Sequence, residues 1–139
     1  MSKEALNIIK KNLGYTEEDM RIFLENEKNI EILKKAPGLA NKTIVVEVIG
    51  SHGCNSQHVV GDKFYFDAFG NLITKLSPKR ICISALATMD RLIFGVTSLL
   101  FANQNPNDML FNKAGCSDVG LKCGGWGNLA MEIKVIDRK

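Results

Sequence analysis

The chain has 139 residues, of which 45% are hydrophobic, 24% charged and 7% aromatic. This composition predicts one globular domain over residues 1–139 and excludes disordered and fibrous proteins. The net charge of +3 comes from 18 basic and 15 acidic residues that form no sustained basic stripe, so no nucleic-acid partner is indicated.

The first part of the chain is predicted to be helical. Apolar residues at helical spacing followed by Gly14 indicate a helix over 3–13. Thr16, ahead of three acidic residues, indicates the N-cap of a second helix. A third helix should end by Ala36, because Pro37 disfavours helix in the residue before it. Two roles stay open for the helical element at 1–36: packing on the main body, or self-association in a homo-oligomer.

The rest of the chain predicts a small sheet packed on one long helix. Apolar and polar residues alternate over 43–50 and 129–136, which indicates strands, and residues 62–75 suggest a hairpin around a Gly-containing turn. A helix of about 20 residues is expected between Pro78 and Asn103. The predicted fold class is α+β, with a core at 43–137 and an antiparallel or mixed sheet of about four strands.

The sequence also predicts a location for the protein. The opening residues contain no apolar signal-peptide region. The most apolar stretch, 81–102, carries Asp90 and Arg91 at its centre and contains Gly95, which favours a buried core helix over a membrane span. We therefore expect a cytoplasmic protein without a membrane partner, whose four cysteines are reduced.

Two segments contain the residues best suited to chemistry. Residues 51–58 hold Cys54 and His58, and the irregular stretch 103–128 holds further candidates. Long irregular segments in a compact domain are usually functional or disordered. The candidates in the second segment are Cys116, Asp118, Cys123 and the run Gly124-Gly125-Trp126.

The first hypothesis is a transition-metal site. Thiolate and imidazole suit zinc or iron, and the two loops offer Cys54, His58, Cys116 and Cys123 as ligands. The Cys-x6-Cys spacing is longer than in structural zinc knuckles, so the sequence matches no zinc finger. The role of the metal, structural or catalytic, stays open. The alternative is that Cys116 and Cys123 are small buried apolar residues.

The second hypothesis is a metal-free enzyme with a reactive cysteine acting on a small-molecule ligand. Cys54 is the first candidate, with His58 as its base and Asp118 beside the substrate. Cys82 is the other candidate, because a thiol near the start of the long helix meets free N–H groups, the helix dipole and the cations Lys79 and Arg80. The alternative is that Cys82, between two isoleucines, is a buried apolar residue. The backbone of Gly124 and Gly125 would bind a substrate or cofactor oxygen, with Trp126 as a stacking wall.

Three segments carry a family resemblance. Residues 54–64 contain Cys-x3-His followed by Val-Gly-Asp, residues 81–86 contain Cys82, and Gly115-Cys116 precede the last strand. In these segments the chain resembles a family of small, largely uncharacterised bacterial and archaeal proteins. The resemblance covers about residues 43–136 and implies a compact α+β fold with a Cys/His site, without indicating a substrate. The helical N-terminus and residues 123–127 depart from the family's shorter form.

A third hypothesis belongs to a different class. The protein would be a non-catalytic interaction module that associates through its N-terminal helices, with its cysteines merely buried. The metal site predicts bound zinc or iron, the reactive cysteine predicts pH-dependent alkylation at one thiol, and the interaction module predicts neither.

Overall fold

The computed structural model of the protein describes residues 3–138. The chain divides into two compact units between Ala40 and Asn41. This division falls between the helical element at 1–36 and the core at 43–137 that the sequence predicts. The single domain and the self-association of the helices stay predictions.

The N-terminal unit consists of three helices, α1 (Lys3–Leu13), α2 (Glu17–Glu25) and α3 (Glu27–Leu39). The predicted helix ends are confirmed for the first two. Gly14 follows α1 with a φ of 67°, and the Thr16 hydroxyl oxygen accepts a hydrogen bond from the N–H of Asp19 at 3.1 Å. The Asp19 carboxylate in turn accepts from the N–H of Thr16 at 2.9 Å, which completes a capping box.

The predicted end of the third helix at Ala36 is wrong. Helix α3 continues through Pro37 to Leu39, and the N–H of Ala40 donates to the Ala36 carbonyl at 2.9 Å. Proline removes one backbone donor, but here the hydrogen-bond pattern resumes within the same turn. Leu39, in that last turn, is buried.

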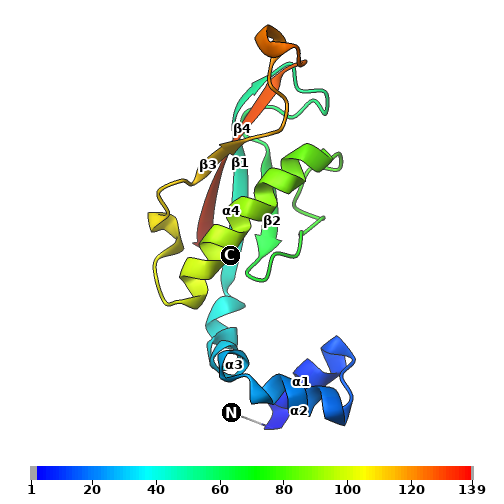
Figure 1. Ribbon diagram of the computed structural model, residues 1–139, viewed down its shortest axis with the longest axis vertical. Coiled ribbons are helices and arrows are strands. Elements are labelled where there is room, and N and C mark those ends of the chain that lie inside the picture. The colour runs from blue at the N-terminus through cyan, green and yellow to red at the C-terminus, as the bar shows by residue number, and fades with distance from the viewer. Residues whose placement is uncertain (1–2, 139) are drawn as a thin grey trace. The chain divides into compact units, whose positions relative to one another are not determined.

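The second unit is a four-stranded antiparallel sheet with one long helix, α4 (Ile83–Phe101), lying across it (Figure 1). The order of the strands is β2-β1-β4-β3, and every neighbouring pair is antiparallel. The strands are β1 (Lys42–His52), β2 (Lys63–Asp67), β3 (Lys113–Gly115) and β4 (Asn128–Asp137). The α+β class predicted from the sequence is therefore confirmed.

The core lies between α4 and the sheet. Alternate residues of β1, β2 and β4 are buried against α4, as a period of two requires. Helix α4 contributes residues three or four positions apart, which form one face of a helix: Ala85, Met89, Leu92 and Val96. In residues 3–138, α4 is also the one helix long and apolar enough to span a membrane by length and composition, a test that core helices pass as well.

Two strand predictions need correction. The first strand does not end at Gly50 but runs to His52, because a register shift between Val48 and Gly50 absorbs the extra residue Ile49 as a bulge. The predicted hairpin over 62–75 forms only its first strand, β2; Leu72 makes a single bridge to Phe66.

The fourth strand, β3, comes instead from the stretch predicted to be irregular. This stretch also contains two short 3-10 helices, η1 (Pro106–Asp108) and η2 (Leu121–Cys123). The side chain of Asn107 extends the sheet edge: its amide group donates to the Val135 carbonyl at 2.9 Å and its oxygen accepts from the Val135 N–H at 2.8 Å. One side chain thus replaces the backbone pairing of a strand residue.

Candidate functional site

The ribbon formed by β1 and β4 brings the two predicted loops to one end of the sheet (Figure 1). His52, the last residue of β1, pairs with Asn128, the first of β4. The connecting residues Gly53 and Gly127 pack so closely that a Cβ on either would overlap the backbone of the other strand. The segments 53–62 and 116–127, here called the His58 loop and the Asp118 loop, therefore leave the sheet side by side.

Asp118 organises its own loop. One carboxylate oxygen accepts hydrogen bonds from the N–H groups of Gly120 and Trp126, and the other from the N–H of Gly127, each at 3.0 Å. The N–H of Gly120, followed by those of Gly127 and Trp126, lowers the pKa of the Asp118 carboxyl against the opposing effect of burial. The carboxylate predicted to act beside the substrate is thus held by three donors of its own loop.

The Gly124-Gly125-Trp126 run also uses its donors locally. The N–H of Gly124 donates to the Leu121 carbonyl at 3.2 Å, and that of Gly125 to the Gly120 carbonyl at 2.8 Å. The N–H of Trp126 donates to Asp118, and the residue is 68% exposed. The three N–H groups predicted to bind a substrate or cofactor oxygen are therefore engaged within the loop.

His58 lies buried at the base of the other loop, 4% exposed. Its carbonyl accepts a hydrogen bond from the Ser51 hydroxyl at 2.6 Å, and its ring meets the Phe64 ring edge to face at 5.1 Å. Its Nδ1 is 3.5 Å from an Asp62 carboxylate oxygen, which itself accepts from the Val59 N–H at 3.1 Å. Its Nε2 is buried and has no hydrogen-bond partner in the described structure.

The four cysteines occupy different surroundings. Cys54, Cys82 and Cys116 are half-buried and pack against the core, whereas Cys123 is exposed; all four are free thiols. Among residues 3–138, no three His, Cys, Asp or Glu side chains are grouped so that they could hold a metal ion. The predicted ligands Cys54, His58, Cys116 and Cys123 do not form such a group in this arrangement.

Cys82 occupies the N-cap position of α4, which confirms its predicted place at the helix start. The sulfur accepts no capping hydrogen bond, but neighbouring donors influence the pKa of its thiol. The N–H of Ala85 above all, then the N–H of Ser84 and the hydroxyls of Ser56 and Ser84, lower the pKa of the Cys82 thiol, while burial opposes them. A thiolate accepts from such donors more strongly than the neutral thiol does.

Sequence reasoning missed Ser56. The hydroxyl faces Cys82 from the His58 loop, so it joins a loop and a helix that are distant in sequence, and no local pattern indicates this contact. Ser84, two residues after the N-cap, could have been found from the predicted helix start.

Comparisons with protein-family models, with curated proteins and with solved structures found no match to the chain. The family resemblance carried by Cys54, His58 and Cys82 accordingly stays a prediction.

Proposed function

We propose that this protein acts on a small molecule through a nucleophilic cysteine, Cys82. The observation that carries the proposal is the position of the sulfur: it lies at the N-terminus of a 19-residue helix, with the Ser56 hydroxyl facing it from another loop. Helix N-termini favour negative charge because their N–H groups lack helical partners. Thiolates, rather than thiols, are the nucleophiles of cysteine chemistry.

In this function the Cys82 sulfur donates an electron pair to an electrophilic carbon of the substrate, whose leaving group departs with the displaced pair. The N–H groups of Ser84 and Ala85 stabilise the sulfur's negative charge before the attack. The Ser56 hydroxyl, which belongs to the His58 loop, also lowers the pKa of this thiol.

The test is alkylation of the native protein with iodoacetamide across a pH series, with each cysteine quantified by peptide mass spectrometry. We expect the rate at Cys82 to reach half its maximum below about pH 8.5, the ordinary thiol value. Ser56→Ala should move this midpoint upward, because it removes one donor. Ser117→Ala, in the exposed part of the Asp118 loop, is the matched control and should leave it unchanged. A Cys82 midpoint at or above about 8.5 would refute the proposal.

A second candidate function, binding of zinc or iron, is favoured by one observation: the buried Nε2 of His58 has no partner within the described residues. Imidazole nitrogen is a common ligand of both metals. Elemental analysis of untagged protein purified without chelator tests it. About one metal ion per chain, lost in both His58→Phe and Cys54→Ser, supports this candidate, whereas a metal-free protein eliminates it.

A further inference from the structure

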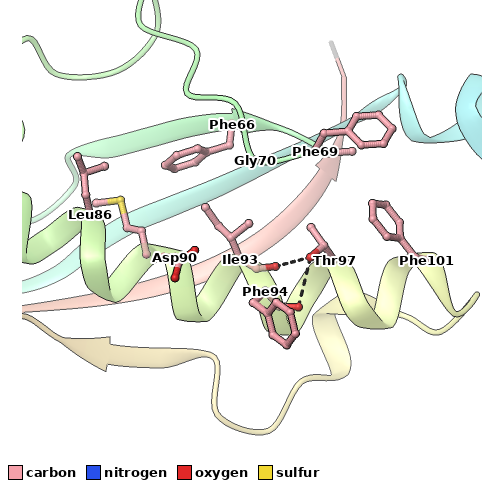
Figure 2. A pocket seen from close by; sticks show the side chains of 11 residues that line it. Phe66, Phe69, Gly70, Leu86, Asp90, Ile93, Phe94, Thr97 and Phe101 are labelled. Atoms are coloured by element: carbon pink, nitrogen blue, oxygen red, sulfur yellow. Dashed lines mark hydrogen bonds between the residues drawn. The ribbon is translucent and has the colours of Figure 1, made fainter. Parts of the chain in front are cut away.

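An aromatic groove runs along α4 (Figure 2), and none of its lining residues belongs to the two loops discussed above. Its volume is about 390 Å³, which lies within the range typical of pockets for small ligands. One wall is α4, and the other is formed by β2 and the turn that follows it. Four phenylalanines line it: Phe66, Phe69, Phe94 and Phe101.

Two aromatic rings of the groove, those of Phe69 and Phe94, are open to a ligand. Phe69 contacts Phe101, with ring centroids 5.8 Å apart and planes inclined at 43°. Phe69 is 55% exposed and Phe94 is 73% exposed. Large apolar side chains exposed around one concave surface are characteristic of binding sites.

Asp90 is the single ionisable residue among those that line the groove. No ion pair within residues 3–138 involves it. Thr97 is the other polar side chain of the lining, and its hydroxyl donates to the Ile93 carbonyl at 2.8 Å. The groove thus combines aromatic faces with one carboxylate that has no cationic partner of its own.

We infer that this groove binds a small organic ammonium compound with an aromatic or branched apolar body. Asp90 and Phe94 stand one helical turn apart, so both face the same part of the groove. A cationic nitrogen there meets the carboxylate and the negative face of a phenyl ring together. The apolar body of the ligand packs along the groove against the exposed ring of Phe69. This binding does not depend on the chemistry of Cys82.

The test is an NMR titration of the ¹⁵N-labelled full chain with benzyltrimethylammonium, compared with phenylacetate, an aromatic anion. We expect shift changes concentrated in residues 66–70 and 86–101, and a Kd at least about fivefold lower for the cation than for the anion. Asp90→Asn should raise the Kd of the cation about fivefold, and Phe94→Ala about threefold.

Matched controls separate the groove from the rest of the surface. Asp108→Asn removes an exposed carboxylate outside the groove, and Phe111→Ala removes a phenylalanine that is 81% exposed elsewhere; both should leave the Kd unchanged. The inference is overturned if cation and anion bind equally, if Asp90→Asn binds the cation like the wild type, or if the shift changes lie outside the groove.

Discussion

The Asp118 loop and the His58 loop leave the same end of the sheet, yet they use their polar groups in opposite ways. In the Asp118 loop, three backbone donors satisfy one carboxylate. In the His58 loop, the buried Nε2 of His58 has no partner within the described chain, and the Ser56 hydroxyl lowers the pKa of Cys82, the N-cap residue of α4. The Asp118 carboxylate is hydrogen-bonded within its own loop, whereas the His58 loop contains a buried nitrogen that no residue of that loop binds.

This difference separates residues that shape a loop from residues that can act on a ligand. Both loops contain residue types suited to chemistry, so their composition alone does not show which of them is the functional site. A carboxylate with three hydrogen bonds to its own backbone has little left to offer a substrate. A thiol among donors that favour its charged form, or a buried nitrogen without a partner, retains that capacity.

The largest effect is expected at Gly127, where the two loops begin side by side. In Gly127→Ala the added Cβ would overlap the carbonyl oxygens of His52 and Gly53. Because backbone on both sides resists movement, we expect a loss of about 3 kcal/mol in the free energy of unfolding, measured with urea. Gly50→Ala is the control, since its Cβ would lie 3.5 Å from that of Ala130, and should change stability by less than about 1 kcal/mol. Equal losses would show that the loops are not held together at Gly127.

The second effect is acid loosening of the Asp118 loop. The pKa of Asp118 is lowered in the folded protein, so its stabilising contribution is complete above the unfolded value of about 4 and is lost as the pH falls through the folded value. Trp126, the single tryptophan of the chain, reports on this loop. Its fluorescence anisotropy should fall below about pH 4 in the wild type.

Asp118→Asn should show the lower Trp126 anisotropy already at neutral pH, with no further acid transition, because no carboxylate remains to titrate. Asp108→Asn serves as the control and should keep the wild-type acid transition. An unchanged transition in Asp118→Asn would mean that another group holds the loop.

The sequence predicted those parts of the fold that depend on local periodicity or capping. Thr16 marked a helix start, and the alternation over 129–136 marked β4, because each pattern acts within a few residues. The short strand β3 was missed, since three residues carry no period and its edge is continued by the Asn107 side chain. Helix α3 continues beyond Pro37, because the unfavourable effect of a proline on the residue before it is not enough to end the helix.

In the candidate site, too, the sequence predicted only features that depend on residues close together in the chain. The sequence predicted correctly that Cys82 lies at the start of the long helix. Asp118 and Gly120 have the spacing of an Asx turn, and this signal could have identified Asp118 as a loop residue. The contact of Ser56 with Cys82 depends on tertiary structure, which no local pattern contains.

The third effect is the pH dependence of stability that the Cys82 thiol contributes. Since the folded-state pKa of this thiol lies below its ordinary value, the folded protein binds fewer protons than the unfolded chain between the two values. The free energy of unfolding should therefore rise with pH up to about 8.5 and then level off. Urea unfolding across this range should show a shallower rise in Cys82→Ser, and the wild-type rise in Cys123→Ser. The same slope in Cys82→Ser as in the wild type would assign the pH dependence to other groups.

The smallest effect is expected at His58, although its side chain is almost fully buried. In His58→Phe an apolar ring of similar size replaces one whose Nε2 has no partner in the described structure, so the unfavourable burial of that nitrogen disappears while the packing on Phe64 is kept. We expect stability in urea to change by less than about 1 kcal/mol, whereas His58→Ala, which leaves a cavity, should lose about 3 kcal/mol. A loss in His58→Phe as large as that in His58→Ala would mean that a ring nitrogen stabilises the fold, either Nδ1 through Asp62 or Nε2 through a partner in solution.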